Sequence, residues 1–119
     1  MLINADCTLY RYDKATGGYT RHFISEVYWR ENKAGNVLKS GLQTADSTTV
    51  YLYSDDAIPS SPTKDMLVKG NCDFVFDNTS QQTISESKRR FDAEHSFVTV
   101  MSIDNYMFGG LPHIEVSAK

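Results

Sequence analysis

The sequence has few of the residues that cross-link a chain or interrupt it. Its 119 residues include two cysteines, three prolines and one tryptophan. Without a secretory context, Cys7 and Cys72 are better interpreted as two buried thiols than as a disulfide. No apolar run is long enough for a membrane helix, and the N-terminus lacks a basic start followed by an apolar stretch. We therefore expect a cytosolic protein, or one assembled from the cytosol, that has no membrane partner.

An excess of charge of one sign is also missing. The formal net charge is −3, and both signs are spread along the chain. Because no basic stripe could follow a phosphate backbone, we expect no specific nucleic-acid binding. The apolar fraction of 40% and the aromatic fraction of 12%, with seven tyrosines, argue against disorder. The length fits a single domain over residues 1–119.

Motifs for catalysis and metal binding are absent as well. The histidines His22, His95 and His113 are far apart, and the cysteines form no Cys-x-x-Cys pair. No nucleophile elbow, phosphate loop or dinucleotide fingerprint occurs. His113 and Glu115 share one face of an expected strand, but a polar outer face is the simpler interpretation. We predict that the protein is not an enzyme and has no cofactor and no metal site.

Alternating apolar and polar residues dominate the chain instead. They predict strands at residues 5–12, 19–30, 48–54, 66–69 and 72–76. In the longest of these strands, Phe23, Val27 and Trp29 share a face with Tyr19. We predict that Phe23 and Trp29 are core residues. Two polar stretches, 32–41 and 55–63, have no period and are expected to be long loops.

One helix is predicted at about residues 80–92. Residues 77–80 are typical of helix caps, and Thr83 with Glu86 fits the capping-box spacing. Only Ile84 and Phe91 form an apolar stripe, with Lys88 between them, so the helix must lie on the surface of a sheet. The expected fold class is mainly β: a small antiparallel β-barrel or sandwich with one surface helix and long loops.

The C-terminal stretch predicts a β-hairpin with a wide tip. A strand at 97–103 is apolar on both faces, which indicates a central position in the wall. One face is expected to carry Phe97, Thr99, Met101 and Ile103, and the other Val98 and Val100. Asp104 and Asn105 then open a loop that Gly109 and Gly110 close, and residues 113–116 return as a second strand.

Three large apolar residues stand together in this expected loop, Tyr106, Met107 and Phe108. Either they fold back over an open end of the barrel, or they form an exposed patch for a partner. Tyrosine, methionine and phenylalanine are all enriched at interfaces, so these residues are a candidate assembly interface.

Residues 98–116 read VTVMSIDNYMFGGLPHIEV. This ending resembles that of the small head-tail joining proteins of long-tailed phages and prophages of Gram-positive bacteria, also called head-closure or minor capsid proteins. Asp104, Asn105, Gly109 and His113 match the family's pattern of a strand, an Asp-Asn pair, a glycine loop, a histidine and a final strand. Where the family usually has Gly-Ser, this chain has Gly109 and Gly110. Segments 27–30, 48–52 and 65–70 also resemble segments of proteins in this family.

The resemblance implies a small β-barrel that assembles as a ring beneath the portal, where it seals the filled head and docks the tail. Its partners would be other copies of itself and the portal, adaptor and tail proteins of the neck. It would be found in the virion neck, and in the bacterial host cytoplasm during assembly. An interpretation of another class is a monomeric soluble β-barrel with a regulatory role, which would bind a ligand or peptide in a pocket lined by Tyr10, Tyr28, Tyr51 and Tyr53. These four tyrosines lie opposite the expected core faces, so the alternative to a pocket is an aromatic outer surface.

Overall fold

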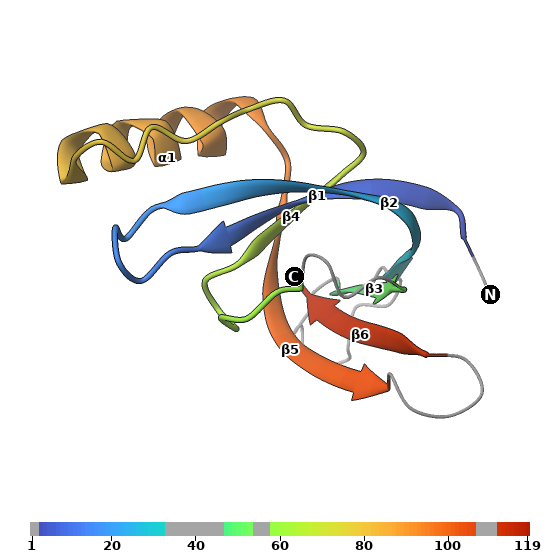
Figure 1. Cartoon of the computed structure of the whole chain (residues 1–119). Helices are drawn as coiled ribbons and strands as arrows, with labels where there is room; N and C mark the ends of the chain where they lie inside the picture. The colour runs from blue at the N-terminus through green and yellow to red at the C-terminus, as the bar shows by residue number, and fades with distance from the viewer. Residues whose placement is uncertain (1–2, 33–46, 54–57, 107–111) are drawn as a thin grey trace, which may run out of the picture.

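A computed structural model describes residues 3–32, 47–53, 58–106 and 112–119 (Figure 1). Within these residues, six antiparallel strands form a closed barrel in the order β1-β2-β3-β6-β5-β4. The elements are β1 (Ala5–Tyr12), β2 (Tyr19–Asn32), β3 (Ser47–Leu52), β4 (Met66–Lys69), α1 (Gln81–Glu94), β5 (Val98–Tyr106) and β6 (His113–Ala118). The predicted fold class, a small antiparallel β-barrel with one helix, is confirmed.

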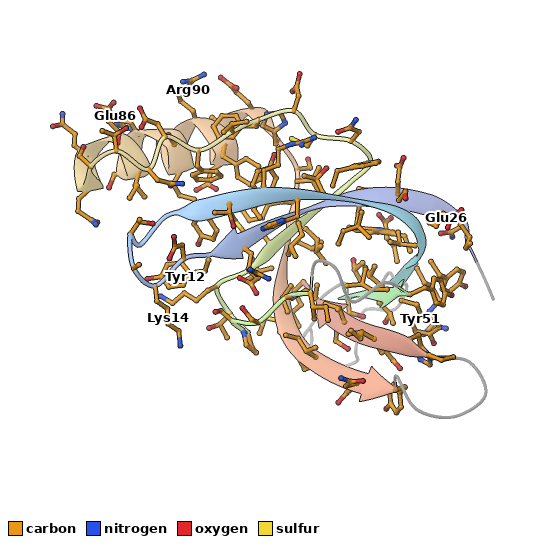
Figure 2. All side chains as sticks on the ribbon, in the orientation of Figure 1. Tyr12, Lys14, Glu26, Tyr51, Glu86 and Arg90 are labelled. Atoms are coloured by element: carbon orange, nitrogen blue, oxygen red, sulfur yellow. The ribbon has the colours of Figure 1, made fainter. Side chains whose placement is uncertain are left out.

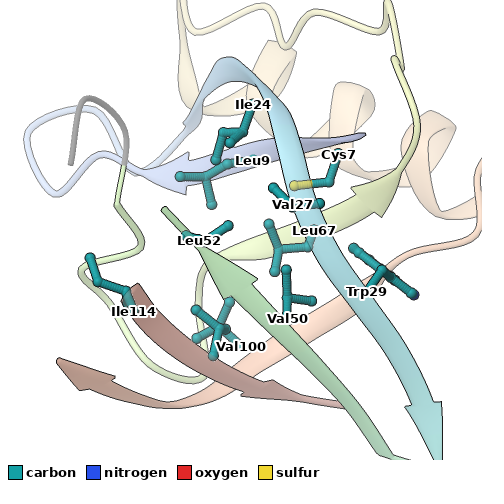
Figure 3. Close-up of a cluster of buried hydrophobic side chains, with 11 residues drawn as sticks. Cys7, Leu9, Ile24, Val27, Trp29, Val50, Leu52, Leu67, Val100 and Ile114 are labelled. Atoms are coloured by element: carbon teal, nitrogen blue, oxygen red, sulfur yellow. The ribbon is translucent and has the colours of Figure 1, made fainter. Parts of the chain in front are cut away.

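The barrel interior is filled by side chains from all six strands. Figure 3 labels most of these side chains. Trp29 is 5% exposed there, and the prediction that it is a core residue is confirmed. Cys7 and Leu9 of β1 are fully buried in the same cluster. Alternate residues of a strand point to opposite faces, so Thr8, between these two, faces away from the interior.

A β-bulge in β2 explains why Phe23 is not in this core. Ile24 and Val27 are three residues apart, but their partners in β1 are two residues apart. Glu26, within the extra step, has a φ of 60°. The bulge reverses the alternation, so Ile24 and Val27 are both buried, while Phe23 is 42% exposed on the outer face. The prediction for Phe23 was wrong because it assumed one unbroken period from Phe23 to Trp29.

A second bulge lies in β5. Val100 and Ser102 are two residues apart but pair with neighbouring residues of β6. As a result Val100 and Ile103 both contact the interior core, while Met101 is 42% exposed. The predicted faces of this strand were therefore wrong after Val100. Its central position was right, because β5 has β4 on one side and β6 on the other.

The helix covers the outer face of the β1–β2 hairpin (Figure 1). Ser80 is its N-cap and forms a capping box with Thr83, whereas the sequence pattern had paired Thr83 with Glu86. Ile84 and Phe91 are buried as expected, and the helix ends at Glu94, two residues beyond the predicted end. Between the helix and the barrel lies a second cluster of buried side chains, to which the helix contributes Phe91. Its members are Tyr10, Met66, Val68, Cys72, Phe76 and Phe91.

The expected strand at 72–76 is not present, and residues 71–78 have no regular structure. Side chains replace the strand ladder here. The Cys72 N–H donates to the Thr8 hydroxyl at 2.9 Å, and the Arg21 Nε donates to the Cys72 carbonyl at 2.6 Å. The side chains still alternate, with Phe76 buried and Val75 70% exposed, and this alternation explains the mistaken prediction. Of the expected loops, 58–63 is irregular apart from one turn, and 33–41 lies outside the described residues.

Candidate functional site

Four aromatic rings form a continuous row on the outside of the barrel. The Tyr28 and Tyr51 ring centroids are 5.4 Å apart, Tyr51 and His113 are 4.9 Å apart, and His113 and Tyr106 are 5.1 Å apart. These residues belong to β2, β3, β6 and β5, which are consecutive neighbours in the wall. We call Tyr28, Tyr51, His113 and Tyr106 the aromatic row.

The strand period explains why the row faces outward. Tyr28 lies between the buried residues Val27 and Trp29, and Tyr51 lies between Val50 and Leu52. Their side chains therefore point away from the interior. Tyr28, Tyr51 and His113 are half-buried against one another, and Tyr106, at the end of the row, is 45% exposed. Each aromatic contact of this kind contributes about 0.5–1.5 kcal/mol beyond its buried area, so the row also fixes the outer wall.

The row changes the interpretation of the hairpin tip. Asp104, Asn105 and Tyr106 belong to β5, so the predicted loop does not open at Asp104. Tyr106 pairs with His113, the first residue of the predicted return strand, which is confirmed. Met107 and Phe108 lie outside the described residues, as do Gly109 and Gly110. Of the candidate assembly interface, the structure therefore places only Tyr106, and it places it at the end of the aromatic row.

Two carboxylates lie beside the row. Asp104 and Glu115 are directly paired across β5 and β6, so their side chains leave the same face of the wall. His113 is two residues before Glu115 and shares this outer face, as the sequence indicated. Neither carboxylate forms an ion pair with any residue that the structure describes. We call Asp104 and Glu115 the acidic pair; like charges placed directly opposite one another disfavour the isolated fold and favour a cationic neighbour.

A hollow of about 590 Å³ lies at the turn between β1 and β2. We call it the basic hollow, and the lining residues that matter here are Arg11, Tyr12, Lys14, Thr20, Ser60 and Ser61. The Lys64 ammonium, outside this lining, lies 5.2 Å from the centre of the Tyr12 ring. Asp13 also borders the hollow, but its carboxylate accepts a hydrogen bond from the Ala15 N–H at 2.9 Å. Figure 2 shows Tyr12 and Lys14 on the opposite side of the molecule from Tyr51.

A buried carboxylate holds one wall of the basic hollow in place. Asp65 is fully buried, and its oxygens accept hydrogen bonds from the N–H groups of Tyr12 at 2.7 Å, Ser60 at 2.6 Å and Ser61 at 2.7 Å. Reasoning from the sequence missed this role. The available signal was an acidic residue directly before an apolar run, at the position where the strand Met66–Lys69 begins.

The family model that matches residues 2–119 is described as a family of unknown function, DUF6751. The chain belongs to this family. No curated protein and no solved structure matches it. Membership in DUF6751 assigns no activity and no partner to this protein. The indications of function are the surfaces described above.

Both cysteines of this DUF6751 protein are free and buried, as predicted. Cys7 lies in the barrel interior, where burial and, to a smaller extent, the charge of Asp6 raise its thiol pKa to about 12. Cys72 lies beneath α1, with its sulfur 3.7 Å from the Nδ1 atom of His95. Among the described residues, no three or more His, Cys, Asp or Glu side chains gather closely enough to hold a metal ion.

The part of the chain described here contains no helix that could span a membrane.

The tyrosines proposed to line a ligand pocket do not meet in one place. Tyr10 is buried beneath α1, where its hydroxyl donates to the Phe74 carbonyl at 2.7 Å. Tyr28 and Tyr51 belong to the aromatic row instead. One pocket shared by Tyr10 and these two residues is therefore not formed, because α1 covers Tyr10 on β1 but not Tyr28 on β2 or Tyr51 on β3. Tyr28 and Tyr51 instead belong to an aromatic outer surface, which was the other interpretation of these residues.

Proposed function

We propose that this DUF6751 protein is a non-enzymatic structural protein of the phage neck, of the head-closure or head-tail joining type. The observation that carries the proposal is the aromatic row across four strands of a closed barrel. Tyrosine combines a large apolar ring with a polar end, and it is enriched at protein interfaces. Every strand of the barrel already has two neighbours, so association uses side-chain surfaces rather than the addition of a strand.

The resemblance of the C-terminal stretch supports the same proposal. Three of the residues that match the family pattern, Asp104, Asn105 and His113, lie at the loop end of the β5–β6 hairpin. His113 is itself a member of the aromatic row, and Tyr106 is paired with it. In the proposed ring this end of the hairpin contacts a neighbouring subunit or an adjoining protein of the neck, such as the portal, the adaptor or a tail protein.

A monomeric regulatory barrel is the second candidate function, and the basic hollow favours it. The hollow offers two cationic side chains, Arg11 and Lys14, and the hydroxyl groups of Ser60 and Ser61. Such a set suits a small anionic ligand. In this alternative the aromatic row has only a structural role, and its replacement changes stability without any effect on assembly.

The test is removal of the gene from a phage or prophage that carries it. The proposal expects DNA-filled heads and separate tails in electron micrographs, and complete particles when the wild-type gene is supplied. A Tyr51→Ser, Tyr106→Ser variant should not restore joining. An Arg89→Ala variant, altered on the exposed face of α1, serves as the matched control and should restore it. Complete particles in the absence of the protein would refute the proposal, and genes for a portal or a major capsid protein nearby would support it.

A further inference from the structure

We propose that the aromatic row and its acidic pair dock into the basic hollow of a second copy of this chain, so that the copies associate head to tail. This inference rests on the proposed assembly function and names the partner of the aromatic row. It also assigns a role to the hollow, which the proposed function leaves unused. The occupant follows from charge, shape and position, each taken from the described residues.

The two surfaces carry opposite charge. Asp104 and Glu115 lie side by side on the outer face of β5 and β6. Arg11 and Lys14 line the hollow together with one carboxylate, Asp13, so its lining has an excess of positive charge. Neither Arg11 nor Lys14 forms an ion pair within the part of the chain that the structure describes. Bringing the two surfaces together relieves repulsion within the acidic pair and creates attraction between the two surfaces. Complementary charges of this kind fix the register of a contact and speed its formation.

Shape supports the same pairing. Tyr106 is the most exposed ring of the row, at 45%, and it stands at the end of the β5–β6 hairpin. The hollow, at about 590 Å³, is large enough to receive the exposed edge of a tyrosine ring. Inside it, the Tyr12 ring and the Ser60 and Ser61 hydroxyls offer both apolar and polar contacts. Because Asp65 already holds the backbone of this wall, docking requires little further ordering.

Position decides between the two ways in which identical copies can meet. Lys14 and Tyr51 lie on opposite sides of the molecule (Figure 2). A two-fold contact through the aromatic row would bring one acidic pair against another, and the like charges would repel. A contact between different surfaces on opposite sides joins each copy to the next, and such heterologous contacts build rings when the rotation closes.

The experiment uses two variants with reversed charges and measures sedimentation velocity over a range of protein concentration. In the first variant Asp104 and Glu115 are changed to Lys, and in the second Arg11 and Lys14 are changed to Glu. The wild type should self-associate at high concentration and low salt, and should dissociate as the salt concentration rises. Each variant alone should associate at least about tenfold more weakly, because both of its contacting surfaces then carry the same charge. An equimolar mixture of the two variants should regain association, since each offers a surface that is complementary to the other.

An Arg89→Glu, Glu94→Lys variant keeps the net charge, alters only exposed positions of α1, and should associate like the wild type. Circular dichroism melting shows that each variant is folded before it is compared. A wild type that stays monomeric at every concentration, variants that associate normally, or a mixture that stays dissociated would each overturn the head-to-tail contact. Those results leave the proposed function intact if the gene is still required for joining, which the particle assay measures separately.

Discussion

The carboxylate of Asp65 accepts a hydrogen bond from the backbone N–H of Tyr12, a residue 53 positions earlier in the chain, at 2.7 Å. The same carboxylate accepts from Ser60 and Ser61. Replacing Asp65 with Ala leaves three donor groups without their acceptor beside a buried site. We expect a loss of roughly 3 kcal/mol or more in the free energy of unfolding, since hydrogen bonds to charged groups are worth about 1.5–3 kcal/mol each and do not add fully. Urea denaturation measures it, and a loss below about 1 kcal/mol would show that water replaces the carboxylate.

Trp29 and Phe23 give a matched pair of large-to-small substitutions in one strand. Trp29→Ala should lower the free energy of unfolding by about 3–5 kcal/mol, because it empties part of the barrel interior. Phe23→Ala should cost less than about 1.5 kcal/mol, because the ring is 42% exposed on the outer face. Equilibrium unfolding of both variants makes the comparison. Equal losses would mean that the bulge at Glu26 is not where the structure places it.

Because the Cys7 thiol is buried, we expect the free energy of unfolding to depend on pH in the alkaline range. Its pKa is raised from an ordinary 9.0 to about 12 by burial. Above pH 9 the unfolded chain loses a thiol proton that the folded chain keeps, so stability falls as the pH rises, until the folded thiol also titrates near pH 12. A Cys7→Ala variant lacks this contribution and should show a shallower decline over that range. Parallel curves for the two proteins, measured by urea denaturation from pH 8 to pH 11, would contradict the prediction.

Gly18 is needed where the β1–β2 turn approaches the start of α1. A Cβ atom at this position would overlap the Asn78 side chain. The side-chain amide of Asn78 forms two hydrogen bonds with the backbone of Tyr19. Its oxygen accepts from the Tyr19 N–H at 3.3 Å, and its nitrogen donates to the Tyr19 carbonyl at 3.1 Å. We expect Gly18→Ala to cost about 1–3 kcal/mol of stability, the usual range for forced overpacking, with the effect seen in thermal unfolding. A Gly18→Ala, Asn78→Ala double variant should lose less than the sum of the two single changes.

Met107 and Phe108 test whether the hairpin tip acts in assembly or in folding. Changing both residues to Ser should leave the unfolding midpoint unchanged and stop heads from joining tails, as the proposed interface requires. A lower midpoint would mean that these side chains complete the core, and complete particles at normal stability would remove the tip from the interface. Thermal unfolding and electron microscopy of the same variant give the two measurements.

The elements of this fold could be predicted from sequence, whereas the direction of many side chains could not. Caps at 77–80 and the stripe of Ile84 and Phe91 located the helix, and alternation located every strand of the barrel. Alternation also predicted a strand at 72–76, which does not form. Alternation gives a correct face only while the ladder is regular, and the two bulges changed the assignment of Phe23 and Met101. A bulge depends on the partner strand, so a single strand's pattern carries little sign of it.

The residues of the aromatic row could be named from sequence, but their contact with one another could not, for a related reason. The aromatic row brings together residues from four strands, and their contact depends on barrel order and register rather than on spacing along the chain. Tyr28 and Tyr51 are directly paired, but His113 reaches Tyr51 only because β6 returns between β3 and β5. Asp65 likewise forms two local contacts and one distant contact, and only the local contacts could have been suspected from sequence.

Strand β1 is buried on both faces, with Leu9 in the barrel interior and Tyr10 beneath α1. Detachment of the helix would therefore expose the outer face of β1, including Tyr10, to water. Opening of the barrel would in turn remove the surface against which the helix packs. Both layers should lose their slowest-exchanging amide protons in one concerted opening, instead of in two steps of different free energy. We therefore expect little of a partly unfolded form in which the helix alone is free, and a protease should cut α1 at the rate at which both layers open.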